Sequence, residues 1–167
     1  MDTLDVNILK KLQLNGRIKH TELARELGVP QSTLLERVRR LEEGQYILGY
    51  HANLNYEKLG LTVQAYIAVT LKQHAKTIIE EIEQIIRETS YIQACHHLTG
   101  RYDYLLHVAA NDLQHLGEIV KNEIASFPGY GTSETFVIFS EIKSAGSWPV
   151  AENSGIVAHN TNSDLLK

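Results

Sequence analysis

The hydrophobic positions of residues 1–50 recur at helical intervals and predict three short helices. The first covers about residues 5–15, and the second is the run HTELAREL, which ends before Gly28. The third starts at Pro30 or Gln31 and runs through LLERVRRLEE. A short helix, a tight glycine turn and a second helix with small polar residues at its start are typical of a helix-turn-helix. We therefore expect a winged-helix-like head.

Beyond a linker and hinge at residues 51–61, the pattern changes to alternating strands and helices. LTVQAYIAVTLK, YIQACHHL, YDYLLHVAA and TSETFVIFSEIK are apolar and partly β-branched, and they predict four strands. HAKTIIEEIEQIIRETS and DLQHLGEIVKNEIASF predict amphipathic helices, the second capped by Asp112. The order βαββαβ over residues 62–143 is the ferredoxin-like arrangement, with both helices on one face of an antiparallel sheet. The predicted fold class is α+β.

The central strands are apolar on both faces, as in AYIAVTL and YLLHVAA, whereas a sheet with helices on one side only should alternate. The second face therefore needs a cover, and the simplest cover is the same sheet of a second copy. The alternative is the polar C-terminal segment, residues 144–167. We expect this tail to be flexible. The other interpretation is an arm that packs on a neighbouring subunit through Trp148, Ile156 and Val157.

Charge is distributed unevenly along the chain, whose formal net charge is −4 at pH 7. Residues 1–50 hold 8 Lys and Arg against 7 Asp and Glu, a balance of +1, and residues 51–167 hold 8 against 13, a balance of −5. These values argue against a protein that binds nucleic acid with a surface that is basic throughout. They indicate two parts with different roles. The single cysteine suits a reducing cytoplasm, and we expect no membrane span and no signal peptide.

A helix-turn-helix binds double-stranded DNA by laying its second helix in the major groove. Polar side chains at the start of that helix reach base edges, and basic side chains further along hold phosphates. The base-edge candidates are Gln31, Ser32 and Thr33, with Glu36 beside them. The phosphate candidates are Arg37, Arg39 and Arg40, with Lys19 and Arg25 as helpers. The alternative from the pattern alone is a plain three-helix bundle with solvated charges.

The run LDVNILKKLQLNGRIKHTELARELGV, followed by LLERVRRLEEGQYILGYHANLN, resembles the Lrp/AsnC (feast/famine) family of transcriptional regulators. The resemblance implies a DNA-binding head, with RVRRLE on the recognition helix and a short strand leading away from it. Two departures concern the helix ends. Pro30 stands where the family usually has serine or threonine, so Thr33 and Glu36 read as a capping box that would start the helix later. The glycine after RLEE is Gly44, one residue earlier than in the family.

The second part of the chain resembles the family's βαββαβ ligand-binding domain, which dimerises through its sheets and commonly assembles into tetramers or octamers. A homodimer would present two heads to two DNA half-sites, spaced about 34–36 Å apart or a multiple of that distance. Several weak contacts acting together would then allow a weakly charged head to bind DNA.

LTGRYDYLL resembles the family's effector loop, which implies a small effector, an amino acid or a related metabolite. Backbone N–H groups around Thr99, Gly100 and Arg101 can hold its carboxylate, and Asp103 can take the ammonium. The alternatives are a salt bridge between Asp103 and Arg101 and ordinary sheet packing of Tyr102. In the family the site lies between dimers, so binding can alter assembly and the spacing of the heads. The side-chain pocket would be lined by Leu98, Tyr102 and Phe136.

Metal and enzyme chemistry are weaker hypotheses. Cys95, His96 and His97 are consecutive on a strand whose side chains alternate between faces, so they cannot converge on one ion, although His107 could pair with one of them. A cysteine in mid-strand is usually an inert small hydrophobe. The enzyme alternative is a sirohaem decarboxylase, which resembles these regulators and handles tetrapyrrole carboxylates with histidine and arginine. We expect no metal, no cofactor and no enzymatic activity.

Overall fold

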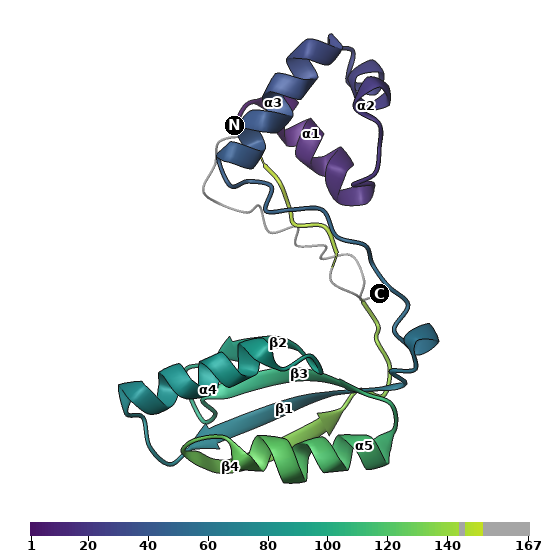
Figure 1. The fold of residues 1–167 in the computed structure, drawn as a ribbon. Coiled ribbons are helices and arrows are strands. Elements are labelled where there is room, and N and C mark those ends of the chain that lie inside the picture. Colours follow the sequence, from purple (N-terminus) through teal and green to yellow (C-terminus); the bar gives the residue numbers. More distant parts are fainter. Residues whose placement is uncertain (144–145, 152–167) are drawn as a thin grey trace, which may run out of the picture. The chain divides into compact units, whose positions relative to one another are not determined.

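The chain divides into two compact units, which we call the head and the body. The computed structural model describes residues 1–143 and 146–151. The head consists of residues 1–53 and the described residues from Lys143 onward, and the body consists of residues 54–142 (Figure 1). Every helix among the described residues is too short or too polar to span a lipid bilayer.

Three helices build the head: α1 (Thr3–Leu14), α2 (His20–Leu27) and α3 (Gln31–Glu43). Their apolar faces meet in one buried cluster, as the spacing of the sequence predicts. Burial of this stripe is what holds such short helices, which are marginal in isolation. The buried residues of the cluster are Ile8, Leu9, Leu12, Leu23, Ala24, Leu34, Val38 and Leu41.

The helix starts differ from the prediction in two places. Helix α1 begins earlier, because Asp2 and Asp5 form a reciprocal capping box: each carboxylate accepts a hydrogen bond from the other residue's backbone N–H, at 3.1 and 3.0 Å. Helix α3 begins directly after Pro30, without a side-chain cap. The Pro30 carbonyl accepts the first helical hydrogen bond, from Leu34. Thr33 therefore lies within the first turn, and the predicted capping box at Thr33 is wrong.

Two glycines end helices of the head for different physical reasons. Gly28 has a φ of +67°, which makes the tight left-handed turn between α2 and α3. Gly44 after α3 has an ordinary φ of −77°, and it is Gln45 that takes the left-handed value of +60°. A Cβ on Gly44 would lie 2.9 Å from the carbonyl oxygen of Arg40. Glycine is therefore needed here because the backbone of Arg40 leaves no room for a side chain.

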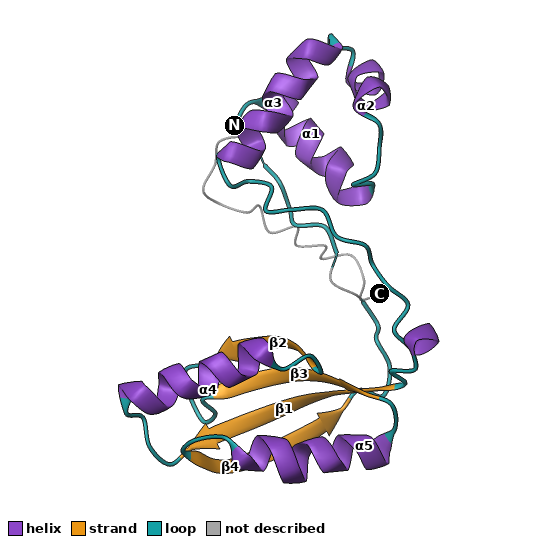
Figure 2. Ribbon diagram, viewed as in Figure 1, coloured by secondary structure: helices purple, strands orange, loops and turns teal. Residues whose placement is uncertain are grey.

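The body has the ferredoxin-like order βαββαβ, which confirms the predicted fold class. Its four strands form one antiparallel sheet in the order β2-β3-β1-β4 (Figure 2). A short 3₁₀ helix, Glu57–Leu59, precedes the sheet. The elements are β1 (Val63–Leu71), α4 (Lys76–Glu88), β2 (Ile92–His97), β3 (Tyr104–Ala110), α5 (Leu113–Glu118) and β4 (Tyr130–Val137).

Two predicted elements of the body have different limits in the structure. The helical segment after the Asp112 cap, which accepts a hydrogen bond from His115 N–H at 2.7 Å, continues beyond α5 as a π turn and a 3₁₀ turn. Strand β4 ends at Val137, although the apolar pattern extends further. Beyond Val137 one more backbone hydrogen bond joins the chain to β1, from Ile138 N–H to the Gln64 carbonyl at 2.8 Å, and Phe139 and Ile142 then lie exposed.

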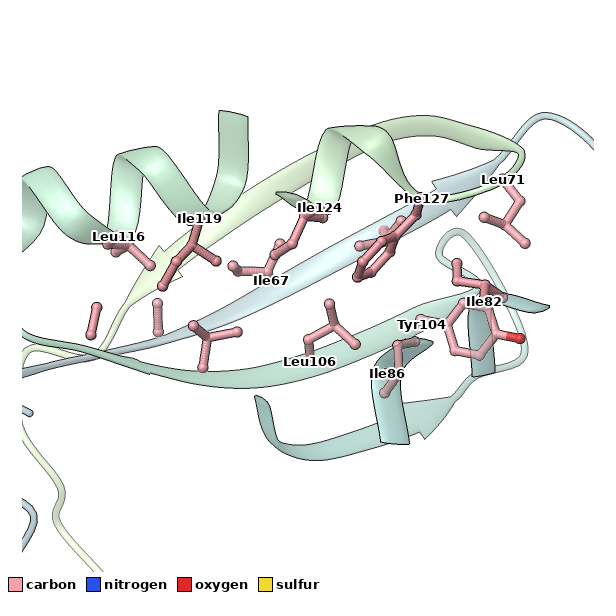
Figure 3. Close-up of a cluster of buried hydrophobic side chains, with 14 residues drawn as sticks. Ile67, Leu71, Ile82, Ile86, Tyr104, Leu106, Leu116, Ile119, Ile124 and Phe127 are labelled. Atoms are coloured by element: carbon pink, nitrogen blue, oxygen red, sulfur yellow. The ribbon is translucent and has the colours of Figure 1, made fainter. Parts of the chain in front are cut away.

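Helices α4 and α5 cover one face of the sheet, and the hydrophobic core lies between them and that face (Figures 2 and 3). Alternate residues of β1, such as Ile67 and Val69, point into this core and are fully buried. Leu106 of β3 meets Ile119 and Phe127 of the second helical segment in the same layer (Figure 3). The core therefore fixes the register of the strands and the faces of their side chains.

No element of the body covers the opposite face of the sheet, which we call the open face. Tyr66 of β1 lies between His107 of β3 and Phe136 of β4 on this face. Tyr66 stacks on His107 with ring centroids 4.9 Å apart, and Phe136 is 50% exposed. Polar side chains such as Glu134 share the face, so it is less uniformly apolar than the sequence suggests.

Candidate functional site

The outward surface of α3 is the first candidate site. Leu34, Val38 and Leu41 bind this helix to the core of the head, so the opposite side chains face outward. The Gly28 turn sets the start of α3 directly after α2, in the helix-turn-helix arrangement. Thr33 is partly buried and Arg37 lies at the edge of the core. The exposed residues of this surface are Gln31, Ser32, Leu35, Glu36, Arg39 and Arg40.

The arginines of α3 differ in their surroundings. The Arg37 guanidinium contacts the Asp2 and Asp5 carboxylates at 2.5 and 3.1 Å. Arg39 pairs with Glu43 at 3.0 Å. For Lys19, Arg25 and Arg40, the structure shows no side-chain hydrogen bond or ion pair among the described residues, and all three are exposed.

These contacts separate the phosphate candidates. Arg37 joins α3 to the start of α1, so its charge is already neutralised within the head. Arg39 and Glu43 are both highly exposed, and such surface pairs contribute little free energy, so Arg39 can turn to another anion. Arg40 is the candidate on α3 whose charge has no partner in the described part of the chain.

The loop between β2 and β3 is the second candidate site. Leu98 N–H donates to the carbonyl oxygen of Asp103 at 2.8 Å and closes the loop. Gly100 has a φ of +123°, which favours glycine, and a Cβ there would meet open space. In the described structure, the backbone N–H groups from Thr99 to Tyr102 donate no hydrogen bond. The loop therefore presents consecutive free donors, as an anion site requires.

Asp103 is held firmly at the end of this loop. Its carboxylate accepts a hydrogen bond from Leu71 N–H at 2.7 Å and lies 2.8 Å from Nε2 of His74. Its own N–H donates to Val69 at 2.9 Å. Burial alone would raise the pKa of Asp103, but the hydrogen bonds from Leu71 and His74 lower it below its usual value. Asp103 is therefore ionised at neutral pH and also joins the loop to β1.

Arg101 pairs with Glu134 of β4 at 2.6 Å, so the predicted alternative of a salt bridge with Asp103 is wrong. The Arg101 guanidinium also lies 5.1 Å from the centre of the Tyr102 ring. A hydrogen bond to Glu134 raises the pKa of Tyr102. Phe136 stands two residues along β4 on the same face as Glu134, opposite Tyr66, which places it on the open face.

Sequence reasoning missed Glu134 and His74 at this site. Glu134 lies far from Arg101 in the sequence, and only the pairing of Ala68 with Glu134 across β1 and β4 brings it near. His74 follows β1 in a loop without a recognisable motif. Two carboxylates, those of Asp103 and Glu134, thus contact the loop or close it, where the sequence predicts one.

Cys95 and His97 point to the helix side of the sheet, and His96 points to the open face, as the strand alternation predicts. Cys95 and His97 line a small cavity with Tyr104, on which His97 stacks at 4.8 Å. Burial raises the pKa of the Cys95 thiol to about 11, so the thiol stays protonated at neutral pH. No group of three or more potential metal ligands occurs among residues 1–143 and 146–151.

Residues 146–151 lie on the head, and we call this segment the strap. The Gln13 side chain forms two hydrogen bonds with the backbone of Trp148. Its amide oxygen accepts one from Trp148 N–H at 2.6 Å, and its amide nitrogen donates one to the Trp148 carbonyl at 3.2 Å. Val150 packs against the buried cluster of the head. Trp148 thus binds its own chain through its backbone, and its ring is 83% exposed. The other two predicted anchors, Ile156 and Val157, lie outside the described residues.

Comparison with known proteins agrees with the division into a helix-turn-helix head and a βαββαβ body. The sequence matches an AsnC-type helix-turn-helix domain over residues 1–42 and an Lrp/AsnC ligand binding domain over residues 64–148. The leucine-responsive regulatory protein of Escherichia coli K12 is 34% identical over 143 residues, which cover 86% of this chain and 87% of that protein.

Solved structures give the same result. A Neisseria meningitidis transcriptional regulator in complex with L-methionine is 31% identical, with a TM-score of 0.85 over 89% of this chain and 96% of that chain. LrpC of B. subtilis is 29% identical, with a TM-score of 0.77 over 87% of this chain and 99% of that chain. With its helix-turn-helix head and βαββαβ body, the chain therefore belongs to the Lrp/AsnC family of transcriptional regulators.

Proposed function

We propose that a homodimer of this protein binds double-stranded DNA through the outward surface of α3 and that an amino acid bound at the loop from Leu98 to Asp103 modulates this binding. The observation that carries the DNA proposal is the exposed start of α3 after the Gly28 turn, with the unpaired Arg40 further along. Such a regulator works where the DNA is, in the cytoplasm. The named relatives are regulators, so the tetrapyrrole enzyme is not proposed.

The amino-acid proposal follows from the chemistry of the loop. The free N–H groups from Thr99 to Tyr102 suit a carboxylate, and the carboxylates of Asp103 and Glu134 suit an ammonium. A relative of 31% identity was solved with L-methionine, which supports the same class of ligand.

The open face supports the homodimer. Tyr66 on the inner strand β1 and Phe136 on the edge strand β4 lie exposed on it, and a second copy of the same face would bury both. A dimer supplies two heads for two half-sites, which strengthens DNA binding because the second contact becomes intramolecular. We propose further assembly into tetramers or octamers by the family's example.

The DNA proposal is tested by salt-dependent binding of Arg40→Ala. Removing one phosphate-binding side chain from each head should weaken binding to all sequences. It should also reduce the slope of log K against log salt by about 0.9 for each phosphate that is no longer neutralised. Arg87→Ala, which changes an exposed arginine of α4 in the body, is the control and should leave the slope unchanged. An unaltered slope for Arg40→Ala contradicts the proposed interface.

The effector proposal is tested by the thermal shift with each amino acid, because a ligand of the folded state raises the melting temperature. Asp103→Asn should abolish the shift and, through its amide oxygen, keep an acceptor for Leu71 N–H. Asp112→Asn is the matched control, since asparagine caps a helix about as well as aspartate. If Asp103→Asn responds as fully as the wild type, the effector binds elsewhere.

A further inference from the structure

Leu35 is an apolar side chain on the outward surface of α3. It is 41% exposed, whereas Leu34, Val38 and Leu41 on the inner side of the same helix are at most 3% exposed. Leu35 is therefore the most exposed of the apolar side chains of α3. A single exposed leucine is unremarkable by itself, so its surroundings decide whether it has a role.

The other exposed large hydrophobic side chains of residues 1–53 share a different surface. They line one groove, which α1, the segment after α3 and the strap enclose. Leu35 is not among the residues that line this groove. The four residues in the groove are Leu14, Tyr46, Leu48 and Tyr50.

Leu35 lies in the middle of the surface proposed to read base edges. It is one helical turn beyond Gln31 and one turn before Arg39, so the three side chains form one stripe along α3. The stretch from Gln31 to Glu36 has no basic residue, so its contacts with bases are hydrogen bonds and apolar packing. The apolar feature that the major groove offers is the C5-methyl group of thymine.

We propose that Leu35 packs against the C5-methyl group of a thymine and so helps to determine the DNA sequence that this protein selects. The inference rests on the proposed function, because α3 must lie in the major groove. It specifies one contact within that function, between Leu35 and the methyl carbon of a thymine base. The free energy comes from removing a methyl group and part of a leucine side chain from water.

The test removes the methyl group from the DNA and the side chain from the protein. The preferred duplex is first selected with the wild-type protein from a random library. Each thymine is then replaced in turn by deoxyuridine, which lacks only the methyl group. The wild type should lose about fourfold in affinity at one position of each half-site, the value for one buried carbon. Leu35→Ala should bind the thymine and deoxyuridine duplexes equally.

Leu14→Ala is the matched control, because Leu14 is also an exposed leucine of the head but lies on α1. It should keep the wild-type difference between thymine and deoxyuridine. Circular dichroism melting establishes that Leu35→Ala folds. The inference is overturned if selection finds no preferred sequence, if no deoxyuridine duplex loses affinity, or if Leu35→Ala still discriminates. Arg40→Ala tests the DNA interface separately, so failure of the thymine contact is distinguishable from failure of the proposed function.

Discussion

At the scale of single residues, the structure reassigns charged side chains that look alike in the sequence. Arg37 and Arg40 are three positions apart on α3, yet Arg37 is neutralised by Asp2 and Asp5 while Arg40 has no partner in the described part of the chain. Asp103 shows the same effect, because its carboxylate serves the fold as well as the proposed ligand. When a variant of such a residue loses function, its stability must therefore be measured as well.

Asp103→Ala should lower the free energy of unfolding by about 1–3 kcal/mol at neutral pH, since it leaves Leu71 N–H without its acceptor. The pKa of Asp103 is lowered in the folded state, so its stabilisation is present above the unfolded pKa of about 3.9 and is lost as pH falls through the folded pKa. Urea unfolding at a series of pH values should show the difference between wild type and variant shrinking below about pH 4.

The control for this prediction is Glu80→Ala, which removes an exposed carboxylate paired with Lys76 on α4. Its effect should stay within about 0.5 kcal/mol. A constant difference between wild type and Asp103→Ala from pH 7 to pH 3 contradicts the role given to the carboxylate.

At the scale of elements, the position of a helix follows from the spacing of its apolar residues. The ends of helices and strands depend instead on contacts with the rest of the fold. The amphipathic pattern locates α3, but Pro30 rather than Thr33 stands at its start. Strand β4 ends at Val137, opposite Ala65, although both β1 and the apolar run continue past this pair. The strap is the clearest case, since no local pattern in residues 146–151 indicates that Gln13 will bind them.

Gln13→Ala should loosen the strap. It removes both hydrogen bonds to Trp148 and should destabilise the attachment by about 1 kcal/mol, given that the site is exposed. Trp148 is the single tryptophan of the chain, so a fall in its fluorescence anisotropy reports the release. Gln114→Ala, which removes an exposed glutamine of α5, should leave the anisotropy unchanged. Equal anisotropy in wild type and Gln13→Ala would mean that the strap does not depend on Gln13.

At the scale of the whole molecule, the sheet has one face in the core and one face without a cover from the body. The apolar residues of the core face alternate with those of the open face along β1, where Ile67 and Tyr66 point to opposite sides. The sequence predicts the need for a second cover, and the register shows which side chains that cover would meet. The proposed dimer follows from this asymmetry.

Tyr66→Asp combined with Phe136→Asp should convert the proposed dimer into a monomer, because two like charges on each copy would have to be buried against each other. Both side chains are exposed within one chain, so each copy should still fold. Sedimentation velocity measures the change. Leu113→Asp, on the outer side of α5, is the control and should leave the assembly intact. A double variant that sediments as the wild type does would place the interface elsewhere.

The order of the elements, the helix-turn-helix, the βαββαβ body and the Asp112 cap can all be predicted from local patterns of residues. These features depend on periodicity and on turn residues within a few positions of one another. Three contacts become apparent only in the folded chain: Arg101 with Glu134, Asp103 with Leu71, and Gln13 with the strap. Those contacts join residues about thirty to more than a hundred positions apart, and strand register and core packing alone bring them together.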